Sequence, residues 1–223
     1  MRTDTRPSGY SSRRRSPAVP VAFVVMLLLG GLALSGCHKN DPLLEAAALT
    51  NSVSGGRTAG SAALVKSWKA GDLKLDAAMN LAFDYLESAK DNRPLKGTTV
   101  IVPSANATNF AGAVLDALEQ VQSQLPQAGE FEIFWMRVGG LAFAAAEEAH
   151  AAGRVAEART LVFAGGKRWQ NDAYWQGHSA HDGLASVILA KSGERAEAIA
   201  RLRDRADLNG VAAEVYEMLQ KGQ

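Results

Sequence analysis

The sequence predicts an all-α fold for residues 64–223, built from antiparallel helical hairpins stacked on one another. From residue 64 onward, apolar residues recur three or four positions apart, which is the spacing that places them on one face of a helix. Alternating apolar and polar patterns, which are typical of half-buried strands, are nearly absent. A short motif that begins at Gly153 returns at Gly193, 40 residues later, and indicates two similar hairpins in the last third of the chain.

The composition fits one ordinary globular domain preceded by a targeting segment. The chain has 223 residues, of which 47% are apolar, and this is enough for a packed core. Five arginines and a single acidic residue lie in the first sixteen positions. Beyond residue 36 the chain therefore keeps 19 of its 24 basic and 22 of its 23 acidic residues, a net charge of −3. That balance gives no electrostatic reason to expect nucleic acid as a partner.

The first 37 residues are arranged in three blocks. Residues 1–16 are polar and basic, residues 17–35 are almost continuously apolar, and the chain then reads Leu34-Ser35-Gly36-Cys37. This order of blocks is typical of a signal peptide. The four-residue motif resembles the lipobox of bacterial lipoproteins, which consists of an aliphatic residue, two small residues and a cysteine.

The lipobox resemblance implies that residues 1–36 are a signal peptide removed by cleavage and that fatty acids such as palmitate are attached at Cys37. Several acyl chains would anchor the mature chain to a membrane without spanning it. The residue after the cysteine is His38, not the aspartate that favours inner-membrane retention in many Gram-negative bacteria. The resemblance thus implies a location in the cell envelope, facing the periplasm from the outer membrane if the source is Gram-negative.

An uncleaved transmembrane anchor is the alternative for this N-terminal segment, because the apolar run is nearly long enough to cross a bilayer. Cys37 is the only cysteine of the chain, whereas exported proteins otherwise tend to carry cysteines that can pair. The apolar run is also interrupted by Pro17, Pro20, Gly30 and Gly31. Both features favour lipidation over a membrane span.

Residues 37–63 are expected to form an acylated N-terminus followed by a flexible tether. A helix-compatible patch at 42–49 is followed by a stretch, 52–61, in which glycine and serine are dense. Such a composition is typical of flexible linkers. We expect this segment to let the globular part stand off the membrane.

The next elements follow from the apolar spacing and its interruptions. A pair of helices begins near residue 64, is broken at Gly71-Asp72 and ends at Arg93-Pro94, because a residue before proline is pushed out of helical geometry. The stretch 97–103 looks extended, but it is too short to build a sheet, and proline ends it.

Two further helices are expected before the repeated motif. The first ends before Pro126, and the second runs from about 130 to 152 and is apolar enough to resemble a membrane span. Glu132, Arg137 and Glu147-Glu148 make a membrane location costly and favour a buried core helix. The helix that ends before Pro126 should begin among four residues that cap helices well, Ser104, Asn106, Thr108 and Asn109.

The repeated motif reads Gly-Arg-Val-Ala-Glu-Ala-Arg at 153–159 and Gly-Glu-Arg-Ala-Glu-Ala-Ile at 193–199. In both copies an alanine-rich helix precedes the glycine and an amphipathic helix follows. Glycine tolerates the left-handed conformation that closes the first helix, and a small alanine lets the second helix pack closely. Each copy therefore predicts a helical hairpin.

The two copies resemble tetratricopeptide repeats, over residues 131–208. The offset between them exceeds the usual length of about 34 residues. Four positions match in each copy: a small residue, the turn glycine, a second small residue and a large apolar residue. In the first copy they are Ala146, Gly153, Ala158 and Val162. In the second copy they are Ser186, Gly193, Ala198 and Leu202. The sequence departs from the family where an aromatic residue or a closing proline is usual, at Ala149, Leu189, Gln170 and Gly210. The resemblance implies a right-handed superhelix that binds a protein or peptide.

Aromatic and histidine residues are concentrated in the segment 169–182. On a helix, His178 and His181 would share a face with Tyr174 and Trp175. The first helices of such hairpins line the concave side, so these four residues are the candidate partner-binding residues. For the aromatic side chains, core packing between the hairpins is the favoured interpretation, and contact with a ligand is the alternative.

The sequence contains no recognisable enzyme motif. It has no glycine-rich phosphate loop, no Gly-x-Ser-x-Gly elbow and no His-Glu-x-x-His zinc motif. Cys37 is assigned to lipid and is not available as a nucleophile. A metal site at His178 and His181 would need Asp182 as a third ligand, but this adjacent side chain points partly away. We therefore expect neither enzymatic activity nor a cofactor nor a bound metal.

These features predict a membrane-anchored lipoprotein that serves as a helical-repeat interaction or assembly module in the cell envelope. Its partners would be membrane lipid, through Cys37, and a protein or peptide. The alternative is an immunity or inhibitor lipoprotein that neutralises a toxin in the periplasm. A neighbouring gene for a secreted toxin would favour that alternative.

Overall fold

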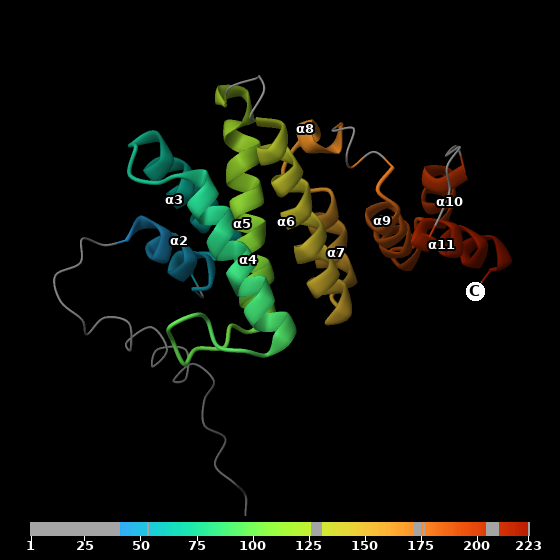
Figure 1. Ribbon diagram of the computed structural model, residues 1–223, viewed down its shortest axis with the longest axis horizontal. Helices are drawn as coiled ribbons and strands as arrows, with labels where there is room; N and C mark the ends of the chain where they lie inside the picture. The colour runs from blue at the N-terminus through green and yellow to red at the C-terminus, as the bar shows by residue number, and fades with distance from the viewer. Residues whose placement is uncertain are drawn as a thin grey trace, which may run out of the picture. The chain divides into compact units, whose positions relative to one another are not determined.

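The computed structural model describes residues 41–52, 54–125, 131–171, 175, 177–203 and 210–222. Within these ranges the chain forms ten α-helices and one 3₁₀ turn, with no strand, which confirms the predicted all-α class (Figure 1). None of these helices is long and apolar enough to cross a membrane. The predicted signal peptide, the lipobox with Cys37, and Tyr174 lie outside the described residues.

The helices are numbered from α2, as in Figure 1. They are α2 (Pro42–Thr50), α3 (Gly56–Lys69), α4 (Leu75–Asp91), α5 (Ser104–Val121), α6 (Phe131–Ala151), α7 (Val155–Val162), α8 (Lys167–Gln170), α9 (Ser179–Lys191), α10 (Arg195–Arg203) and α11 (Gly210–Lys221), with the 3₁₀ turn at Gln122–Gln124.

Helices that are neighbours in the sequence pack against each other. The pairs α2–α3, α4–α5, α5–α6, α6–α7 and α9–α10 are in contact, and α3 also packs on α5 and α11 on α9. The break predicted at Gly71-Asp72 lies between α3 and α4, as expected. The stretch 97–103 contains no strand and leads into α5.

Four of the described helices end on the same local turn, three of them with a glycine in the left-handed position and α4 with Asn92. After α3, α6 and α9 a glycine with positive φ, at Gly71, Gly153 and Gly193, follows the last helical residues. In each turn the N–H of the glycine or of Asn92 donates to the carbonyl three residues before it, and the next N–H donates to the carbonyl five residues before it. These are the two hydrogen bonds of the Schellman motif, for which glycine is favoured because it has no Cβ. The predicted role of Gly153 and Gly193 is therefore confirmed.

The buried apolar side chains form two clusters. The larger involves α2 to α9 and includes Phe110, Trp135 and Trp169. The smaller joins α9, α10 and α11. Half-buried Phe163, at the end of α7, packs against both clusters. The members of the smaller cluster are Leu189, Ala198, Leu202, Ala212, Val215 and Leu219.

The prediction of a flexible tether up to residue 63 is wrong for the part of it that the structure describes. Residues 42–50 form α2, in which Ala46, Ala47 and Thr50 are buried. Gly60 lies so close to Thr50 that a Cβ at this glycine would overlap the Thr50 side chain. The small residues that resemble a linker in the sequence are thus the residues that let α2 and α3 approach each other. Among the described residues, the helical domain therefore already includes α2 and α3.

Candidate binding site between the hairpins

The predicted aromatic and histidine segment lies mainly in the core. The rings of Trp169 and Trp175 meet edge to face, with centroids 6.3 Å apart. The His181 ring packs 5.4 Å from Trp169 and 5.6 Å from Trp175. Exposed fractions are 0% for Trp169, 8% for Trp175 and 3% for His181. This placement favours the core-packing alternative for Trp175 and His181, and their role in partner binding stays a prediction.

Two hydrogen bonds and one glycine fix the tryptophan rings. The indole N–H of Trp169 donates to the carbonyl oxygen of Ala164 at 2.6 Å, and that of Trp175 donates to the carbonyl oxygen of Met136 at 3.0 Å. Trp175 lies directly over Gly139 of α6, where a Cβ would overlap the indole ring. The Gly139-Gly140 pair in the sequence therefore admits a tryptophan ring from the loop before α9.

The two histidines have different surroundings. His178 is half-buried and caps α9, because its Nδ1 accepts a hydrogen bond from the His181 backbone N–H at 3.4 Å. Burial, and to a smaller extent His181, lowers the pKa of His178. Both ring nitrogens of His181 lack a hydrogen-bond partner in the described part of the chain. Burial, and then the positive charge of Arg201, lowers the pKa of His181 to about 4, so its ring is neutral at pH 7.

Asp182 is engaged in an ion pair with α10. Its buried carboxylate accepts from Nη2 of Arg201 at 2.9 Å and from Nε at 3.1 Å. His181 Nδ1 lies 3.8 Å from the same carboxylate, beyond hydrogen-bond reach. Across the described ranges, no three histidine, cysteine, aspartate or glutamate side chains gather in a way that could hold a metal ion.

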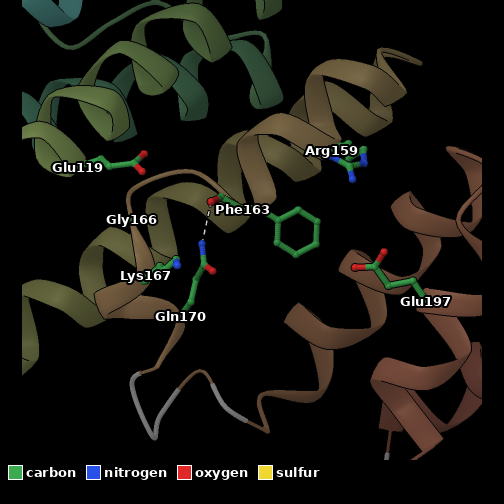
Figure 2. Close-up of a pocket in the computed structure, with 7 residues that line it drawn as sticks. All are labelled: Glu119, Arg159, Phe163, Gly166, Lys167, Gln170 and Glu197. Atoms are coloured by element: carbon green, nitrogen blue, oxygen red, sulfur yellow. Dashed lines mark hydrogen bonds between the residues drawn. The ribbon is translucent and has the colours of Figure 1, made fainter.

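A pocket of about 390 Å³ lies between the two hairpins, outside the predicted site. The ring of Phe163 lies at its centre in Figure 2, with Lys167 and Gln170 on one side and Arg159 and Glu197 on the other. Its lining residues come from α5, α7, α8 and α10, and they are Glu119, Arg159, Phe163, Gly166, Lys167, Gln170 and Glu197.

The apolar part of the pocket is held in place by its neighbours. The Arg201 guanidinium lies 5.8 Å from the centroid of the Phe163 ring. The side-chain N–H₂ of Gln170 donates to the Phe163 carbonyl oxygen at 2.7 Å (Figure 2). Gly166, which precedes α8, has a φ of 88° and no room for a Cβ beside Gln122. A side chain at this position would strain the backbone and require the Gln122 side chain to move.

The rim of the pocket carries charges of both signs. Arg159 of α7 forms a two-pronged ion pair with Glu194, in which its Nη2 lies 2.7 Å from Oε2. Their mutual hydrogen bond raises the pKa of Arg159 and lowers that of Glu194. Exposed Lys167 adds a positive charge, and exposed Glu119 and Glu197 add negative ones. Mixed charges around an aromatic ring suit a polar chain with an apolar side chain, such as a peptide.

No residue of this pocket stands out in the sequence as a candidate for binding. They come from four helices between residues 119 and 197, and their contact depends on how the hairpins pack. The Gly165-Gly166 pair, which directly follows the first hairpin, is the local signal of a constrained turn there. It carries no information about binding chemistry.

The fold and the pocket define an all-α protein of paired helices with a polar pocket between two hairpins. Comparison with protein-family models, curated proteins and solved structures finds no match to this chain.

Proposed function

We propose that this protein is a lipid-anchored protein of the cell envelope that binds a peptide segment of a partner protein between its two C-terminal hairpins. The observation that carries the proposal is the pocket, in which the half-buried side chain of Phe163 is surrounded by Lys167, Gln170, Arg159 and Glu197. An apolar side chain of a peptide can pack on this ring. The amide and charged groups around it can bind the peptide backbone and flanking side chains.

The paired helices support a repeat-like binding module. Each of the hairpins α6–α7 and α9–α10 has a glycine in a Schellman turn, Gly153 and Gly193. A buried alanine follows each glycine five positions later, at Ala158 and Ala198. These are positions at which the sequence resembles tetratricopeptide repeats. A right-handed superhelix with a concave peptide-binding side is part of the proposal.

The membrane anchor is supported by the sequence alone. The motif Leu34-Ser35-Gly36-Cys37 follows a basic and then an apolar block, as in lipoprotein signal peptides. We propose acylation of Cys37 and a location in the outer membrane, facing the periplasm, for a Gram-negative source. Replacement Cys37→Ser should abolish incorporation of labelled fatty acid and release the protein from the membrane fraction. A variant that still carries labelled fatty acid would disprove this assignment.

Site-specific cross-linking in cells tests the binding pocket. A photoreactive residue in place of exposed Lys167 should yield a discrete adduct, whose other half maps to one peptide segment of one partner. The same residue in place of Lys69, an exposed lysine of α3, is the matched control and should not give this adduct. Equal adducts at both positions, or none at Lys167, would contradict the pocket as the binding site. A cross-linked segment from a secreted toxin would favour the immunity or inhibitor alternative.

A further inference from the structure

We infer that the face of the domain that carries α2 lies directly on the lipid bilayer, and that the exposed leucines of α2 contact the headgroup layer. The inference rests on the proposed acylation of Cys37. It adds a second partner surface, the membrane itself, to the proposed peptide pocket. It also replaces the expectation that a long tether holds the domain away from the membrane.

The number of residues between Cys37 and α2 limits the distance of the domain from the membrane. Four residues, 38–41, separate Cys37 from Pro42, the first residue of α2. Fully extended, a chain spans at most about 3.6 Å per residue, so the two Cα atoms lie no more than about 18 Å apart. Acyl chains in the bilayer hold Cys37 within a headgroup layer that is about 5–8 Å thick. The start of α2 therefore lies no more than about 18 Å from that layer.

The helix α2 is a fixed part of the domain, so it cannot act as additional linker. Ala46 belongs to the larger buried cluster, and Thr50 packs beside Gly60 of α3. The Asp41 carboxylate caps the helix by accepting from the Leu43 N–H at 2.9 Å. In Figure 1, α2 lies against the helices that follow it. A constraint on the first residue of α2 is thus a constraint on the whole domain.

The exposed side chains of α2 fit a membrane surface. The exposed fraction of Leu44 is 44% and that of Leu49 is 37%, so both are among the exposed large apolar side chains of the described residues. Asp41 and Glu45 are exposed on the same helix. Carboxylates are costly in the acyl region, so the helix stays among the headgroups, and zwitterionic lipids suit it better than anionic ones.

Fluorescence quenching in vesicles tests the contact. Because acylation at Cys37 uses the only thiol of the chain, an introduced cysteine is the only free thiol. The acylated full-length protein would carry Leu44→Cys, with Glu45→Cys as a second site in case the first disturbs the fold. Each would be labelled with a fluorophore and placed in vesicles of phosphatidylcholine and phosphatidylethanolamine with nitroxide headgroups. Met218→Cys, on α11 and also 37% exposed, is the matched control.

The expected result is loss of fluorescence at positions 44 and 45 but not at 218. Inserting about 20 Gly/Ser residues after Lys39, which adds a span of about 25 Å, should remove the quenching without affecting acylation. Equal quenching at all three positions, or none at 44 and 45, would overturn the membrane contact. Quenching that survives the insertion would overturn the role of the short spacer. Mass spectrometry of the protein shows whether Cys37 carries acyl chains. Their absence would disprove the proposed anchor and this inference together, and is thereby distinguished from the outcomes above.

Discussion

His181 is a neutral imidazole enclosed by aromatic rings. Trp169, Trp175 and Phe143 pack around it, and neither ring nitrogen finds a hydrogen-bond partner among the described residues. Adding a proton would place a charge in this apolar environment, close to the guanidinium of Arg201. Asp182 already pairs with Arg201, so it offers the imidazolium little compensation.

Stability should therefore fall as the pH is lowered. The pKa of His181 is about 4 in the folded protein and about 6.5 in an unfolded chain, so the unfolded state binds more protons between these values. The contribution of His181 is complete above pH 6.5 and is lost as the pH falls towards 4. We expect the free energy of unfolding to drop by about 2 kcal/mol from pH 7 to pH 5.

Urea denaturation at both pH values measures this effect, and His181→Phe is the control. The substitution keeps an aromatic ring but removes the titrating group, whereas Asp182, His178 and Arg201 remain. Between pH 7 and pH 5 the free energy of unfolding of the variant should fall by about 2 kcal/mol less than that of the natural protein. An identical pH dependence in both proteins would show that His181 is not the responsible group.

The two adjacent glycines of α6 should respond differently to the same substitution. A Cβ at Gly139 would overlap Trp175, so Gly139→Ala should lower the free energy of unfolding by about 1–3 kcal/mol, as overpacking does. A Cβ at Gly140 would lie 3.8 Å from Trp175, an ordinary contact. Gly140→Ala should be neutral or stabilising by up to about 1 kcal/mol, because alanine is the better helix former. Thermal melts of the two variants check the contrast, and equal effects would contradict the placement of Trp175.

At the scale of the elements, close helix contacts depend on small side chains at defined positions. Ala158 of α7 and Ala198 of α10 are fully buried, at equivalent positions after the glycine turns. The Arg159–Glu194 ion pair connects α7 to the turn before α10. It is exposed to solvent, so it contributes little to holding the hairpins together.

Enlarging the buried alanine tests this arrangement. Ala198→Leu should overfill the contact between α10 and its neighbours and cost about 1–3 kcal/mol. Ala196→Leu places the same side chain on the exposed side of α10 and should change stability by less than about 0.5 kcal/mol. Chemical denaturation distinguishes the variants. A free energy of unfolding unchanged by Ala198→Leu would contradict the buried position of this residue.

The sequence predicts the long helices and their breaks because those signals are local. The glycine turns after α3, α6 and α9 involve hydrogen bonds within six residues, and the residues that form them are adjacent in the chain. Residues 42–49 were recognised as compatible with a helix, but the packing of α2 into the domain was not predicted, because its buried residues, such as Ala46 and Ala47, are small and show little periodicity. The pocket was missed because Glu119 and Glu197 meet only through tertiary packing.

At the scale of the whole molecule, Phe163 connects the two buried clusters. This half-buried side chain packs against both the larger and the smaller cluster. The smaller cluster consists of only a few side chains from α9, α10 and α11. On its own it buries little apolar surface, and Phe163 links it to the larger cluster together with α9, which has buried side chains in both.

Removing the Phe163 ring should therefore uncouple the two clusters. Phe163→Ala should cost about 2 kcal/mol, less than a fully buried phenylalanine, and should split unfolding into two transitions. All four tryptophans precede α9, so their fluorescence reports the larger cluster, whereas far-ultraviolet circular dichroism reports every helix. The two melting curves should coincide in the natural protein and separate in the variant. Curves that still coincide in Phe163→Ala would contradict this connecting role.

Pairing between neighbouring helices also bears on how fast the chain folds. Most helix partners here are successive in the sequence, so few contacts require a long loop to close first. Folding rates rise as the mean sequence separation of contacts falls. A chain that crosses a membrane unfolded, as the proposed export requires, is open to proteases and aggregation until its contacts form. Hairpins that close on their own glycine turns shorten that interval.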